Sequence, residues 1–114
     1  MADTINFTII GDAYTKNSNI TMVEIITDEG NFIYTDANGW NAQPRAHQTT
    51  PVKLKVAIRN DGNATGDIHL SIRDILASTT LFEKTINIGA GVEVTSEFDF
   101  NMPNGDVSLG IYTN

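Results

Sequence analysis

The sequence contains no cysteine, so neither a disulfide framework nor a cysteine-ligated zinc site can hold this chain together. Its 114 residues suffice for one domain, residues 1–114, that buries roughly two-thirds of its unfolded surface without such cross-links. Basic residues are also scarce: 7 Lys and Arg face 14 Asp and Glu, which gives a net charge of −7. Because no basic run compensates locally, we expect no nucleic-acid partner.

Long apolar runs are missing as well. No segment approaches the roughly 18 apolar residues that a membrane-spanning helix requires, so we expect no membrane insertion. The first residues, "MADTINFTII", lack the basic start and long apolar core of a signal peptide. The sequence is therefore that of a cytoplasmic or virion-borne protein, or of one whose signal peptide was removed.

Leucine, a strong helix former, is rare, and β-branched residues are abundant. There are 5 Leu against 14 Ile, 6 Val and 14 Thr. Branching at Cβ restricts the side-chain rotamer in a helix and suits a pleated surface. Asn and Gly, which favour turns, number 12 and 9. This composition predicts an all-β protein.

Alternation of apolar and polar residues places the strands of the second half. It predicts strands near residues 52–59, 68–73, 80–88, 92–102 and 107–111. Lys84 is out of step with its neighbours, which indicates a bulge or an edge strand. The residues predicted to form the centre of the core are Val56, Leu70, Ile88, Val94, Phe98, Phe100 and Leu109.

The first half is less regular. We expect strands at residues 5–10, 19–27 and 31–35, the last two joined by a short hairpin loop. Residues 36–51 show no periodicity and form the longest loop, of a length that is often functional. About eight strands with one wet face each predict an immunoglobulin-like antiparallel β-sandwich.

The second half also resembles a known family. The segments "VKLKVAIRNDGNATG", "IHLSIRD", "INIGAGVEVTSEFDF" and "MPNGDVSLGIYT", within residues 52–112, are similar to CARDB domains, the cell-adhesion-related domains of bacteria and archaea. This resemblance implies an immunoglobulin-like fold, an extracellular or envelope location, and adhesive or spacer roles. The family has no catalytic residues to transfer to this chain.

No catalytic constellation is visible, so we expect no enzyme, no cofactor and no metal. His47 and His69 have no nucleophile in a recognisable motif. Glu93, Glu97 and Asp99 line one face of a strand, where a solvated surface is the simplest interpretation. The loops "DANG" and "NDGN" hold oxygen ligands suited to calcium but lack the spacing of a calcium loop.

Three Asn-x-Thr triplets, beginning at Asn6, Asn19 and Asn63, fit the pattern of glycan acceptors. Asn6 lies inside a predicted strand, whereas Asn19 and Asn63 fall at predicted turns that could accommodate a glycan. Their use depends on secretion.

The long loop holds the only tryptophan, Trp40. An exposed indole can stack on a sugar or anchor a protein interface, whereas the alternative is that Trp40 folds back and plugs one end of the sandwich. The candidate interaction residues are Trp40, Tyr34, Asn38, Asn41 and Arg45.

The segment "INFTII" at residues 5–10 is apolar and is followed by the polar, glycine-containing linker "GDAYTKNS". It can form an ordinary first strand of its own sandwich, or it can pair with the open sheet edge of a neighbouring copy. The candidate exchanged-strand residues are Ile5, Phe7, Ile9 and Ile10.

These observations predict a structural or adhesion-type interaction domain of a cell surface, an extracellular filament or a virion. Its expected partners are copies of itself or neighbouring surface proteins, through sheet edges or the N-terminal strand. The alternative is a carbohydrate-binding module that uses the Trp40 loop.

Overall fold

The computed structural model describes residues 3–114, which contain eight β-strands and no helix that could cross a membrane. The strands are β1 (Ser18–Thr27), β2 (Gly30–Thr35), β3 (Gly39–Trp40), β4 (Pro51–Asn60), β5 (Gly66–Asp74), β6 (Thr79–Ile88), β7 (Glu93–Asn101) and β8 (Leu109–Thr113). The prediction of an all-β chain is confirmed.

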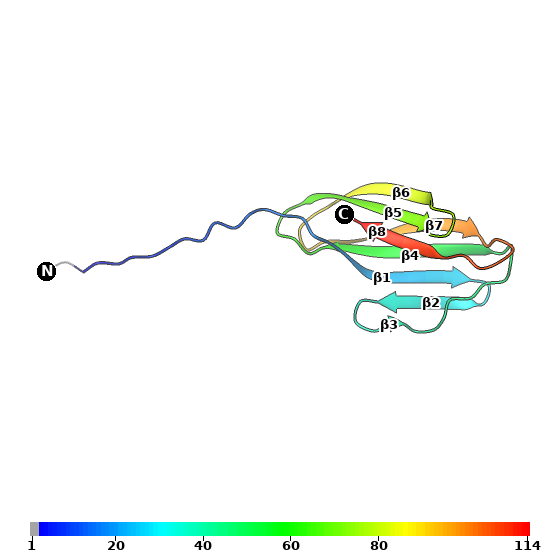
Figure 1. Cartoon of the computed structure of the whole chain (residues 1–114). Helices are drawn as coiled ribbons and strands as arrows, with labels where there is room; N and C mark the ends of the chain where they lie inside the picture. The colour runs from blue at the N-terminus through cyan, green and yellow to red at the C-terminus, as the bar shows by residue number, and fades with distance from the viewer. Residues whose placement is uncertain (1–2) are drawn as a thin grey trace.

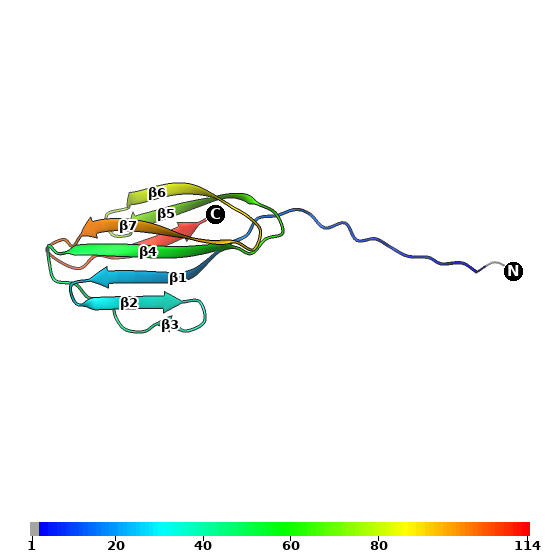
Figure 2. The same cartoon turned by 180° about the vertical axis from the view of Figure 1, so that it is seen from behind.

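The strands form two antiparallel sheets that pack face to face as a β-sandwich (Figure 1). The larger sheet has the order β3-β2-β1-β4-β7, and the smaller one has the order β6-β5-β8. The smaller sheet covers β4, β7 and the adjacent part of β1, whereas β2 and β3 extend beyond it (Figures 1 and 2). Among residues 3–114, no strand therefore pairs with the edge of β8 that faces away from β5.

The register of the strand pairs accounts for the core. Val23 of β1 lies opposite Val56 of β4, and Leu54 lies opposite Phe98 of β7, so alternate residues of these strands point at the smaller sheet. That sheet contributes apolar side chains from β5 and β6. The buried cluster consists of Val23, Leu54, Val56, Ile58, Ile68, Leu70, Ile72 and Ile88.

The predicted core centre is partly correct. Val56, Leu70 and Ile88 are buried, whereas four other predicted members are only half-buried: Val94, Phe98, Phe100 and Leu109. Val92, placed inside by its alternation, is 48% exposed because it lies in the turn before β7. The prediction at Lys84 holds, since β6 is an edge strand with a register shift against β5.

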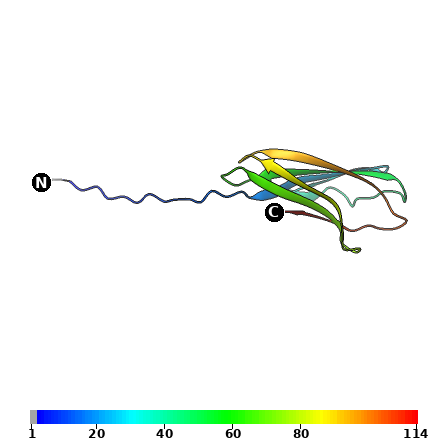
Figure 3. The same ribbon diagram turned by 90° about the horizontal axis from the view of Figure 1, so that it is seen from above.

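The predicted strand at residues 5–10 is wrong. Residues 3–17 form an extended arm that leaves the sandwich at the beginning of β1 and makes the molecule 85 Å long (Figures 1 and 3). The predicted number of eight strands is met only because β3, inside the expected long loop, takes the place of this strand. The sandwich itself comprises residues 18–113.

Candidate functional site

The N-terminal arm, residues 3–17, exposes a row of large apolar side chains. Ile5, Phe7, Ile9 and Ile10 are between 77% and 85% exposed, and Tyr14 is 86% exposed. Residues 3–12 form no hydrogen bond with any other part of the described chain. Ile5, Phe7 and Ile9 alternate with polar residues, so in an extended chain all three point to one face. The arm is an extended apolar segment without a partner among residues 3–114.

The base of the arm, in contrast, is held firmly by the turn between β4 and β5. Asn63 receives a hydrogen bond from the backbone of Thr15 (2.8 Å) and donates one to the carbonyl of Ala13 (3.0 Å). The backbone amides of Asn63 and Ala64 both donate to the Thr15 carbonyl. We call this turn, residues 60–66, the clamp, because it fixes the direction in which the arm leaves the sandwich.

Asn60 joins the clamp to the core. Its side chain is completely buried and makes four hydrogen bonds: it accepts from the amides of Asn17 and Gly62 and donates to the carbonyls of Ala64 and Ile88. Every donor and acceptor of this buried amide is thereby satisfied, which removes the cost of burying it. The turn motif "NDGNATG" thus holds the arm as well as reversing the chain.

Gly62 is required by this close approach. A Cβ atom at this position would overlap the carbonyl oxygen of Thr15 and lie 2.8 Å from the amide of Asn17. Both contacts are to backbone, which cannot rotate away. The clamp can therefore hold the arm only with glycine at residue 62.

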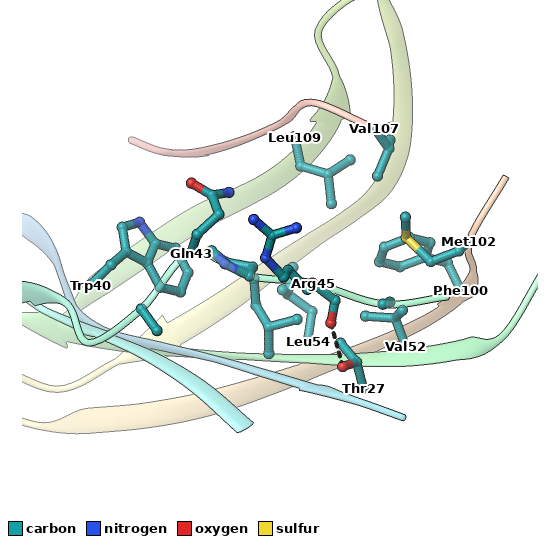
Figure 4. Close-up of a pocket in the computed structure, with 14 residues that line it drawn as sticks. Thr27, Trp40, Gln43, Arg45, Val52, Leu54, Phe100, Met102, Val107 and Leu109 are labelled. Atoms are coloured by element: carbon teal, nitrogen blue, oxygen red, sulfur yellow. Dashed lines mark hydrogen bonds between the residues drawn. The ribbon is translucent and has the colours of Figure 1, made fainter. Parts of the chain in front are cut away.

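At the opposite end of the sandwich, a cleft of about 520 Å³ opens between the two sheets (Figure 4). In Figure 4, Val107 and Leu109 lie on one side of it and Val52 and Leu54 on the other. Its lining is mostly apolar and comes from β1, β3, β4, β7, β8, the loop 41–50 and the segment 102–108: Ile25, Thr27, Trp40, Ala42, Gln43, Pro44, Arg45, Ala46, Val52, Leu54, Phe100, Met102, Val107 and Leu109. The cleft explains why Phe100 and Leu109 are only half-buried.

Two of the predicted interaction residues line this cleft. Trp40 is 44% exposed at one end of it, and the indole packs on Tyr34 with 5.6 Å between the ring centroids. The guanidinium group of Arg45 points into the cleft (Figure 4) and forms no salt bridge with any other residue of 3–114. Trp40 therefore neither projects freely from a loop nor closes the end of the sandwich.

The two predicted asparagines have local roles. The Asn41 side chain accepts a hydrogen bond from the amide of Ile33 (2.9 Å), and its backbone donates to the Ile33 carbonyl, which extends the pairing of β2 and β3. The amide of Asn38 donates to the Thr35 hydroxyl within the turn before β3. Neither side chain lines the cleft.

His47 lies near the cleft and forms an ion pair with Asp28, with 2.6 Å between Nδ1 and Oδ2. The hydrogen bonds that His47 donates to Asp28 lower the pKa of this carboxyl group, and Asp28 together with Glu29 raises the pKa of His47. Ligand atoms of these three exposed residues lie within 4.8 Å of one another, so they could hold a metal ion. The contacts of Asp28 with His47 and Thr50 also attach the loop 41–50 to the end of β1.

The remaining sequence candidates are separate from the cleft. His69 lies on the outer face of β5 beside Thr85 and Glu83. Glu97 makes ion pairs with Lys53 and Lys55 on the outer face of the larger sheet, as expected for a solvated surface. These side chains do not converge on the cleft.

The glycan-acceptor asparagines have different environments. Asn63 uses its side chain to hold the arm, so a glycan there would compete with the clamp. Asn19 lies within β1, which corrects its predicted position in a turn. Asn6 is exposed on the arm.

Sequence reasoning did not identify the cleft or the clamp. Met102 and Val107 fall at ordinary inward positions of the predicted strands 92–102 and 107–111, and alternation shows which face a side chain takes but not whether a neighbouring strand covers it. The clamp carried a detectable signal, since Asn60 and Asn63 flank a glycine in one turn, but their partners in the arm lie more than 40 residues away.

Comparison of this chain with protein-family models, with curated proteins and with solved structures found no match. The CARDB-like and immunoglobulin-like assignments of residues 52–112 therefore stay predictions from the sequence.

Proposed function

We propose that this protein is a non-enzymatic structural domain that assembles with copies of itself through its N-terminal arm, in an extracellular filament, at a cell surface or in a virion. One observation carries the proposal: Ile5, Phe7 and Ile9 are held outside the sandwich by the clamp, in a strand-like pattern. A row of exposed apolar side chains of this kind is typical of an interaction site.

Energetic considerations favour strand pairing over simple side-chain packing. Burying Ile5, Phe7 and Ile9 would contribute about 1.5–3 kcal/mol each. Association itself costs about 4–15 kcal/mol, so three side chains alone give at best a weak complex. An extended arm that also adds its backbone to a sheet edge gains main-chain hydrogen bonds, as in β-strand addition.

The test is to remove residues 1–12 and keep the clamped residues 13–17. We expect the full chain to assemble with rising concentration in light scattering, and the shortened chain to stay monomeric with an unchanged melting temperature. A matched pair of substitutions in the full chain sharpens the result: Phe7→Asp should prevent assembly, whereas Asn6→Asp, on the opposite face of the arm, should leave most of it. A full chain that is monomeric at every concentration, or a shortened chain that still assembles, would contradict the proposal.

A carbohydrate-binding module is the second candidate, supported by the half-exposed indole of Trp40, which lines the same cleft as Arg45. Glycan-array screening of the wild type and of Trp40→Ala separates the two functions. Binding that only the wild type shows would support the module, and absence of binding in both would remove it.

A further inference from the structure

The sandwich has four sheet edges, and they differ in how open they are to another strand. β3 is only two residues long, and β7 carries Glu93, Glu97 and Asp99. On β6, Lys84 lies opposite Leu70 and so places a charge on the inward face, a known means of blocking an edge. β8 has no charged residue, and among the described residues no strand pairs with its edge away from β5. Among the described strands, only β8 offers an uncharged edge of more than two residues.

The backbone of β8 is arranged to accept a partner. Asn114 exchanges hydrogen bonds with His69 of β5, and Ser108 accepts one from Ile75. In an antiparallel pair the residues that bond to one neighbour alternate with those that point away. Leu109, Ile111 and Thr113 therefore present their amides and carbonyls at the free edge.

The cleft adjoins this edge at Leu109, and most of the residues that line it are apolar. Leu109 lines both the edge and the cleft, and Phe100 and Met102 are half-buried within it. The arm supplies the complementary segment: residues 4–11, "TINFTIIG", are uncharged, and Ile5, Phe7 and Ile9 share one face. Insertion would bury apolar side chains from both partners, and the arm itself would bring no charge into the cleft.

The clamp directs the arm away from its own cleft. The arm leaves at the end of the sandwich where β1 begins, whereas the cleft opens at the other end, where β1 ends and β8 begins (Figures 1 and 2). To reach its own cleft, the chain would have to reverse sharply just before the bonds that hold residues 13–17. A second copy placed end to end meets the arm without such a reversal.

From these contacts we infer that the cleft beside β8 receives residues 4–11 of a second copy, with Ile5, Phe7 and Ile9 pointing into it. This inference rests on the proposed function and adds its receiving site. The chain of the arm runs toward the sandwich in the same direction as β1, whereas β8 runs in the opposite direction (Figure 1). In end-to-end copies with the same orientation, the inserted arm is therefore antiparallel to β8. Such a head-to-tail contact does not close on itself and generates a filament.

The absence of cysteine permits a clean cross-linking test in the full chain. Tyr112 lies on the outer face of β8 and Thr85 on the outer face of β6, so the two mark the opposite edges of one sheet. Asn6→Cys and Thr8→Cys are each combined with Tyr112→Cys, or with Thr85→Cys as the matched control. Directly opposite residues on one face of a strand pair lie close enough for a disulfide after small adjustment.

We expect covalent multimers on non-reducing gels with at least one Tyr112→Cys combination, at a yield at least tenfold above that of the Thr85→Cys controls. Equal or greater cross-linking to Thr85→Cys, or cross-linking only within single chains, would overturn the receiving site. Arm-dependent assembly in light scattering would then still support the proposed function. If the full chain never assembles and no pair cross-links between copies, both proposals fail.

Discussion

The two ends of the sandwich are built differently, although the same strands run through both. At the clamp end, Ile58 and Ile68 are completely buried, and every donor and acceptor of the buried Asn60 side chain is hydrogen-bonded. At the cleft end, Phe100 and Met102 are half-buried, and no strand among residues 3–114 pairs with the edge of β8 away from β5. The described residues therefore close the clamp end of the sandwich and leave the cleft end partly open.

The largest difference should appear on truncation of apolar side chains. Ile68→Ala at the clamp end should lower the free energy of unfolding by about 3–5 kcal/mol, because a fully buried side chain leaves a cavity. Met102→Ala at the cleft end should cost about 1 kcal/mol or less, since its site is already partly open. Urea denaturation of the monomeric form measures both, and equal losses would mean that the cleft end is as closed as the clamp end.

A second difference concerns buried polar groups. Asn60→Ala removes four hydrogen bonds and leaves their backbone partners unsatisfied, so we expect a loss of about 2–4 kcal/mol. The exposed Asn104, near the cleft end, is the matched control, and its substitution by alanine should change stability by less than about 0.5 kcal/mol. A small effect of Asn60→Ala in chemical denaturation would show that the clamp is not tied to the core.

Glycine-to-alanine substitutions test the contact between the clamp and the arm. Gly62→Ala should cost about 1–3 kcal/mol, because the new Cβ meets the backbone of residues 15–17. Amide hydrogen exchange at Thr15 and Asn63 should accelerate in this variant, since their hydrogen bonds must separate. Gly105, near the cleft end, has open space around its Cβ position, so Gly105→Ala should change neither quantity noticeably.

The smallest effect should be the pH dependence of the ion pair between Asp28 and His47, which attaches the loop 41–50 to the end of β1. Because the pKa of His47 is raised above its ordinary value of 6.5, the ion pair stabilises the fold fully below pH 6.5 and loses this contribution as the pH rises through the folded-state pKa. Because the pKa of Asp28 is lowered from 3.8, its contribution is complete above pH 3.8 and is lost as the pH falls through its folded-state pKa.

The pair therefore attaches the loop 41–50 most firmly between those two limits. Titration of the His47 imidazole by nuclear magnetic resonance should give a pKa above 6.5, and Asp28→Asn should lower it. An unchanged His47 titration in that variant would contradict the ion pair. No such dependence on Asp28 is expected at the clamp end, where Thr15 and Asn63 hold the arm.

Much of the fold was predictable because alternation is a local signal. It placed β4, β5 and β7 and the buried members Val56 and Leu70 of the core. The alternation at residues 5–10 predicts a strand that the structure does not form, because no local signal says whether such a segment pairs within its own molecule or stays outside the sandwich. Long-range contacts decided that question, above all the bonds from the clamp to residues 13–17.

The candidate site was predictable only in part for the same reason. Trp40 and Arg45 do line the cleft, yet its floor and walls come from residues that look like ordinary core positions in the sequence. The alternation of these strands shows which residues point inward, but it does not show that no further strand covers them. Asn38 and Asn41 attracted attention through their polarity but serve the turns around β3.

The arm continues without interruption into β1, which lies in the middle of its sheet with β2 on one side and β4 on the other. A force that pulls on the arm is therefore transmitted along the axis of β1 and loads both hydrogen-bond ladders in shear. All the ladder bonds must then yield together, whereas a pull on an edge strand across its ladder would open them one at a time. The clamp shares this load, because it bonds to the arm just before β1 begins. Tension applied to the N-terminal arm would consequently reach the centre of the domain before any of its edges.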